Sequence, residues 1–176
     1  MNRLAVLVLA LATFAACGSK TPAAPSSNPN QVKFTAALLP SNEVPAITDA
    51  EASGRGTGTV TLNLTKDAAG TITAVTADFN LDVNSFPAGT PITAAHIHPG
   101  AAGVNGGVMV SMGLGTGEIV LVTGTQTGIS KKGQTNGGTF TPAQAQDMIN
   151  NPQNYYFNIH SQLHSGGVAR GQLVKQ

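Results

Sequence analysis

Four histidines are the side chains whose type and spacing best suit chemistry in this 176-residue chain. They form two short clusters: His96 with His98, and His160 with His164. On a strand, side chains two positions apart leave the same face, so His96 and His98 project together. Neutral imidazole is a ligand for copper, zinc, iron and nickel. The spacing therefore predicts a transition-metal site, with copper or zinc as the candidate ion.

The later cluster supplies the remaining candidate ligands. His160 completes a three-histidine set with His96 and His98 if the two strands are neighbours in the fold. His164, just beyond the second strand, and Glu43, in a loop before a proline, are further candidates for the same site. The alternative is that the histidines only form hydrogen bonds at the surface, and that Glu43 braces its loop.

No complete catalytic set accompanies the histidines, so we assign no catalytic residue and favour a non-enzymatic function. The chain has no Gly-x-Ser-x-Gly motif, and its single cysteine, Cys17, precedes the domain. Nine basic residues stand against eight acidic ones, and only 10% of residues are charged. A balanced and sparse charge gives no electrostatic footprint for nucleic-acid binding.

The N-terminus has the features of an export signal. Arg3 precedes the apolar run 4–16, which is shorter than the roughly 20 residues that a membrane-spanning helix needs. The segment 14–17, Phe-Ala-Ala-Cys, resembles a bacterial lipobox, in which the cysteine is lipidated. We therefore expect a signal peptide at 1–16 and an exported protein held in the bacterial cell envelope by lipid on Cys17. The residues after Cys17 are not acidic, which favours the outer membrane in a two-membraned cell.

The remaining chain reads as one β-rich domain. Residues 17–31 are rich in Pro, Ser and Ala, and we expect a flexible tether there, followed by the domain at 32–176. Threonine or asparagine alternates with apolar residues over 58–65, which predicts a half-buried strand. Further strands are expected at 32–38, 72–83, 92–98, 107–112, 118–124, 155–161 and 169–174, and one helix at 141–149. The predicted fold is an all-β, antiparallel Greek-key sandwich or barrel with one short helix.

Three ordered stretches resemble the CHRD domain, the module repeated in chordin. They are Asn-Glu-Val-Pro at 42–45, Ala-His-Ile-His-Pro-Gly at 95–100 with Gly-Val-Asn-Gly at 103–106, and Asn-Ile-His-Ser at 158–161 leading to 166–173. Val168 stands where the family usually has an acidic residue. The resemblance implies an immunoglobulin-like or related barrel fold and no common reaction. In chordin-like proteins the module belongs to an extracellular binding protein, which suggests an envelope or extracellular protein as a partner.

A weaker resemblance is to copper-zinc superoxide dismutases, which are also Greek-key β proteins. His96, His98, His160 and Arg170 follow the order of the metal ligands and the anion-attracting arginine in that family. The disulfide cysteines and a zinc ligand set have no counterpart. Arg170 is expected to attract an anion or to have a structural role. Three functions remain: a binding module that holds a metal, a copper-dependent redox enzyme, and a purely structural or adhesive envelope module.

Overall fold

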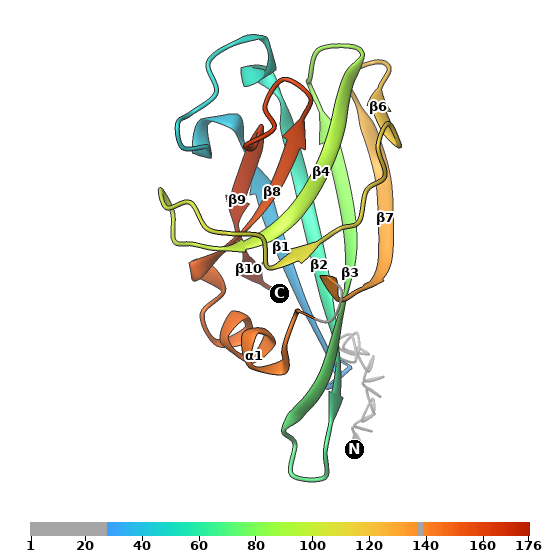
Figure 1. Cartoon of the computed structure of the whole chain (residues 1–176), viewed down its shortest axis with the longest axis vertical. Helices are drawn as coiled ribbons and strands as arrows, with labels where there is room; N and C mark the ends of the chain where they lie inside the picture. The colour runs from blue at the N-terminus through green and yellow to red at the C-terminus, as the bar shows by residue number, and fades with distance from the viewer. Residues whose placement is uncertain (1–27, 137–138) are drawn as a thin grey trace, which may run out of the picture.

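The computed structural model describes residues 28–136 and 139–176, which form a sandwich of two antiparallel sheets (Figure 1). This confirms the all-β fold expected from the alternating pattern. Cys17, the predicted signal peptide and most of the predicted tether lie outside the described residues. Within the described part of the chain, no helix is both long and apolar enough to cross a membrane.

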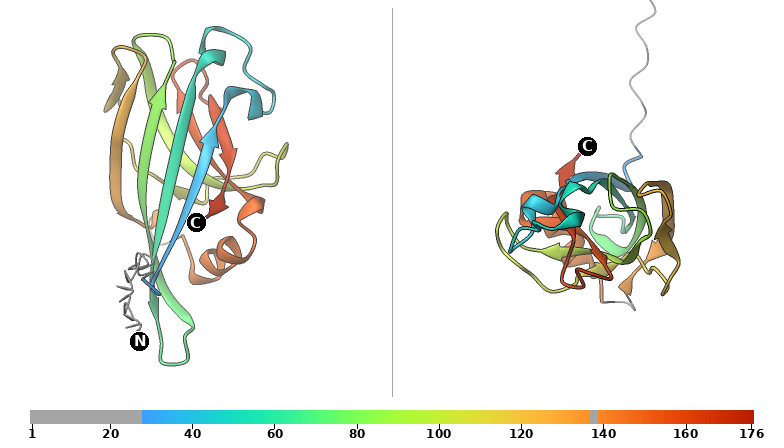
Figure 2. Two further views of the ribbon diagram at one scale, coloured as in Figure 1. Left: turned by 180° about the vertical axis from the view of Figure 1, so that it is seen from behind. Right: turned by 90° about the horizontal axis from the view of Figure 1, so that it is seen from above.

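The first sheet contains the long strands of the N-terminal half. Its order is β10 (Val174–Lys175), β1 (Gln31–Leu38), β2 (Arg55–Lys66), β3 (Ile72–Asn84) and β7 (Gln126–Gln134). Seen from behind, β1, β2, β3 and β7 form one continuous layer (Figure 2). Along β2, buried apolar residues alternate with polar ones, so one face of the sheet covers the core. Asp67 closes the β2–β3 turn by accepting hydrogen bonds from two backbone amides.

The second sheet carries the histidines. Its order is β5 (Val110–Ser111), β4 (Thr90–Pro99), β8 (Tyr155–Ser161) and β9 (Ala169–Gln172), and β6 (Ile119–Leu121) also pairs with β4. The chain enters this sheet after β3, returns to the first sheet for β7, and enters it again at β8. Phe79 and Phe157 meet edge to face in the core between the sheets, with ring centroids 5.7 Å apart.

Short helical segments and one bridge close the ends of the sandwich. Helix α1 (Pro142–Asn150) begins at a capping box, in which Thr141 and Gln144 satisfy each other's backbone amides. The 3₁₀ turns η1 (Pro40–Asn42), η2 (Ala50–Ser53) and η4 (Pro152–Asn154) lie in the connections. Leu39 forms a single β-bridge with Arg170, which joins the two sheets beside β1 and β9.

The sequence pattern did not reveal strand β7. Ile129 is its only buried residue, and Gly128 and Gly133 both adopt positive φ, so the strand has no alternating pattern to detect. It is the edge of the first sheet, where irregular pairing with β3 is tolerated. The strands expected at 107–112 and 118–124 are shorter than predicted, and the strand expected at 169–174 is divided into β9 and β10.

Candidate metal centre

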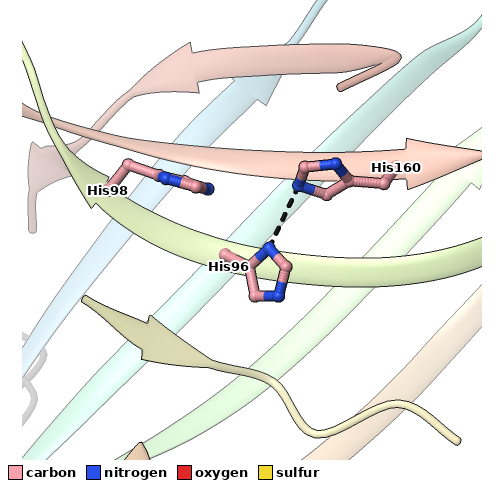
Figure 3. Close-up of side chains that lie close together, drawn as sticks. All are labelled: His96, His98 and His160. Carbon is pink, nitrogen blue, oxygen red and sulfur yellow. Dashed lines mark hydrogen bonds between the residues drawn. The ribbon is translucent and has the colours of Figure 1, made fainter. Parts of the chain in front are cut away.

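His96 and His98 leave the outer face of β4, opposite the core. Ile97, between them, is fully buried in the core, as the alternation of a strand requires. Strand β8 lies antiparallel beside β4 and places Asn158 opposite His96. His160 is two residues beyond Asn158 and therefore leaves the same outer face. The two strands thus bring together histidines that are 64 positions apart in the sequence (Figure 3).

The three imidazoles converge on one small volume, and we refer to His96, His98 and His160 as the three-histidine cluster. Nδ1 of His96 lies 3.0 Å from Nε2 of His160, and one ring nitrogen from each residue lies within 4.8 Å of the others. Two nitrogens bound at about 2.0–2.1 Å to one tetrahedral zinc ion are about 3.3 Å apart. The His96–His160 pair already has nearly this separation. The third nitrogen needs about 1.5 Å of side-chain movement to match it.

Backbone carbonyls fix the tautomers of two rings. Nδ1 of His98 lies 3.0 Å from the carbonyl oxygen of Gly106, and Nδ1 of His160 lies 2.9 Å from that of Ser165. A carbonyl oxygen only accepts, so both Nδ1 atoms carry the proton, and both Nε2 atoms of the neutral rings present lone pairs. Metal-binding histidines are commonly oriented by such carbonyl contacts. Nε2 of His98 is buried and has no hydrogen-bond partner among the described residues.

Burial keeps the cluster in its neutral, ligating form. Burial, together with the neighbouring His160 and His98, lowers the pKa of His96 to about 4. Burial also lowers the pKa values of His98 and His160, although carbonyl hydrogen bonds oppose the shift. All three rings are therefore uncharged at neutral pH.

The loop between β4 and β5, residues 100–109, covers the outer face on which the cluster lies. Besides its contact with His98, Gly106 donates its backbone N–H to the hydroxyl of Tyr156 at 3.1 Å. The Tyr156 ring stacks on the His98 ring with a centroid separation of 4.9 Å and an interplanar angle of 7°. This cover makes His98 a buried residue on the outside of a sheet, with 5% of its surface exposed.

The other two candidate ligands lie outside this group. Nε2 of His164 is 2.9 Å from a carboxylate oxygen of Asp49 and 3.7 Å from one of Glu51. Glu43 is buried in the loop after β1, where one carboxylate oxygen lies 4.0 Å from Nε of Arg170. Neither belongs to the set whose ligand atoms lie within 4.8 Å of one another. His164, in the β8–β9 loop, is therefore hydrogen-bonded to Asp49, and Glu43 lies against Arg170 beside β9.

Arg170 is buried, with 2% of its surface exposed, and holds two loops together. Nε donates to the carbonyl oxygen of Asn42 at 2.7 Å, and Nη1 donates to Oδ1 of Asn105 at 2.7 Å. The guanidinium carbon lies 4.8 Å from the centre of the Tyr156 ring. Of the two roles expected for Arg170, these contacts describe the structural one.

Tyr156 is the residue that sequence reasoning missed. It follows the strand alternation with Asn158 and His160, so the period of β8 places it on the same outer face. That period was available in the sequence. Its stacking on His98 was not, because the contact depends on β4 and β8 being neighbours.

Comparison with known proteins identifies one family. The family model described as the CHRD domain matches residues 34–173. No curated protein and no solved structure matches the chain. The matched region begins in β1 and ends just after β9, so it contains every strand of both sheets except β10, and all three residues of the three-histidine cluster. Because the match covers most of the chain, the protein belongs to the CHRD domain family.

Proposed function

We propose that this CHRD domain is a non-enzymatic binding module of the bacterial cell envelope that holds one transition-metal ion, copper or zinc. The ligands are Nδ1 of His96 and Nε2 of His98 and His160. The observation that carries the proposal is the buried Nε2 of His98, which has a lone pair and no partner among the described residues. One ring nitrogen of His98 lies within 4.8 Å of a ring nitrogen of each of the other two histidines.

Hydrogen bonding alone accounts poorly for this arrangement. His96 and His160 can satisfy each other, and His160 also contacts Ser165. The same reasoning leaves Nε2 of His98 unpaired, which costs about 1–3 kcal/mol for a buried polar atom. A metal ion bound by three nitrogens removes that cost. A purely structural or adhesive module gives no reason for a buried, unpaired Nε2 of His98.

A binding role is better supported than a redox enzyme. The redox hypothesis assigns Arg170 to attracting an anion from solvent. Its guanidinium is instead buried and bonded to loop oxygens. An envelope location is supported by the lipobox-like segment ending at Cys17, so the anchor is part of the proposal.

Metal retention tests the site. The full-length Cys17→Ser chain, purified without a histidine tag, is incubated with copper or zinc, desalted and analysed for its metal content. We expect about one equivalent of metal, and its loss in His96→Ala. His164→Ala is the matched control, because it removes an imidazole outside the cluster, and it should retain the ion. Equal retention by His96→Ala and the unchanged chain would refute the metal site.

The anchor is tested separately. Cells that express the unchanged chain are labelled with a radioactive fatty acid and fractionated. We expect label on the protein and its recovery with membranes, and loss of both in Cys17→Ser. An unlabelled protein that is free of membranes would refute the anchor without affecting the metal site.

A further inference from the structure

The three-histidine cluster offers a metal ion no negative charge. All three donors are neutral imidazole nitrogens, and the group contains no carboxylate within the described ranges. An ion bound there keeps its full charge in a partly buried environment, where water compensates charge poorly. The surrounding charges therefore influence which oxidation state the cluster holds.

The nearest fixed charge is the guanidinium of Arg170, which remains protonated throughout the accessible pH range. Arg170 on β9 and His98 on β4 flank β8 and contact the same Tyr156 ring, at 4.8 Å and 4.9 Å from its centre. The guanidinium thus lies within about 10 Å of the His98 ring.

The countercharge to Arg170 is weak. Among the described residues, Glu43 is the one carboxylate within 4.0 Å of the guanidinium. Burial raises the pKa of Glu43 to about 7, although Arg170 lowers it, so the carboxyl is ionised only about half the time at neutral pH. Oε1 of Glu43 and Nη2 of Arg170 are both buried without partners. The side of the cluster facing β9 is therefore net positive.

We propose that the three-histidine cluster selects monovalent copper, Cu(I), over divalent copper, Cu(II). The inference rests on the proposed function. One additional positive charge about 10 Å from a guanidinium, at an effective dielectric constant of about 20, weakens binding roughly tenfold. For a one-electron couple, that factor raises the reduction potential of bound copper by about 59 mV. The donor number agrees, because Cu(II) favours tetragonal sites, whereas this cluster supplies three donors.

The test compares dissociation constants for Cu(I) and Cu(II). The full-length Cys17→Ser chain is used, because a free thiol would itself bind Cu(I). Cu(I) binding is measured without oxygen against a colorimetric Cu(I) chelator, and Cu(II) binding against glycine, both at pH 8.5, where Glu43 is ionised. We expect Cu(I) to bind severalfold more tightly than Cu(II), because the ionised Glu43 offsets part of the charge of Arg170.

Glu43→Gln tests the electrostatic cause while keeping the side-chain shape. It removes the countercharge of Arg170, so the preference for Cu(I) should increase severalfold. Glu118→Gln is the matched control, because it removes the same charge from an exposed ion pair with Lys131 and should leave the preference unchanged.

The outcomes separate this inference from the proposed function. In one outcome, the chain with all three histidines binds Cu(II) as tightly as Cu(I), and His96→Ala binds neither ion. This result would overturn the selectivity and leave the metal site intact. An unchanged preference in Glu43→Gln would overturn the role of the charged pair. Failure of both copper ions to bind, together with no retained zinc in the desalting experiment, would refute the proposed function itself.

Discussion

Replacing Gly106 with alanine should loosen the cover over the three-histidine cluster. A Cβ atom at this position would lie 1.6 Å from the carbonyl oxygen of Pro99, a backbone atom that cannot rotate away. The φ angle of Gly106 is not positive, so the cost comes from this collision alone. Gly107→Ala is the ideal comparison, because a Cβ atom there meets nothing within 4 Å.

The size of the effect follows from two hydrogen bonds. Relieving the collision requires a backbone shift of at least about 1.5 Å. A shift of that size breaks the bond from Nδ1 of His98 to the carbonyl of Gly106, now 3.0 Å, and the bond from the amide of Gly106 to Tyr156, now 3.1 Å. Each bond contributes about 0.5–1.5 kcal/mol, and a buried imidazole N–H left unpaired costs more. We expect Gly106→Ala to lower the free energy of unfolding by about 2–4 kcal/mol.

Urea unfolding of the apo protein measures this difference. The chain contains two tyrosines and no tryptophan, so tyrosine fluorescence reports directly on the neighbourhood of the cluster. A second measurement is metal affinity, which should fall about 10–100-fold, because Gly106 orients His98, one of the proposed ligands. Stabilities of Gly106→Ala and Gly107→Ala that agree within about 0.5 kcal/mol would refute the argument that this loop fixes His98.

Three further predictions concern charge and helix capping. The pKa of His96 is lowered to about 4 in the folded state from a usual value near 6.5. The free energy of unfolding of the apo protein, measured with urea at each pH, should therefore fall as the pH drops from about 6.5 to about 4. The fall should be smaller in His96→Ala. The pKa of Glu43 is raised to about 7, so its ionisation costs stability as the pH rises from about 4.5 to 7. Glu43→Gln should therefore gain stability relative to the unchanged protein between pH 5 and pH 8, and a constant difference would contradict the assigned shift. Thr141→Ala should cost about 1 kcal/mol of unfolding free energy, because it removes the capping box of α1; no change in thermal unfolding would show that the cap is dispensable.

The sequence predicted the parts of the fold that depend on local periodicity. The alternation in β2 and the pair His96 and His98 are consequences of a two-residue repeat, which is visible without any knowledge of neighbours. Thr141 and the following proline likewise located the start of α1. These features required only the backbone geometry of a single element.

The remaining features depend on which elements are neighbours. The approach of His160 to His96 requires the pairing of β4 with β8. In the sequence, β5, β6, β7 and α1 lie between these two strands. A register shift between Ile92 and Ala94 further changes which residues lie opposite each other. The burial of His98 depends on a loop whose path follows from contacts with Tyr156 and Arg170. None of these relations leaves a periodic trace in the chain.

Strand β8 is buried at each of its seven positions and lies between β4 and β9. A strand without a solvent-facing side exchanges its amide hydrogens with water only through the rarest and largest openings of the molecule. His160 is therefore attached to one of the slowest-opening parts of the protein, whereas His96 on β4 is only partly buried. The lifetime of a bound ion should then follow the motion of the His96 side chain, on a timescale far shorter than the opening of the scaffold that carries the other ligands.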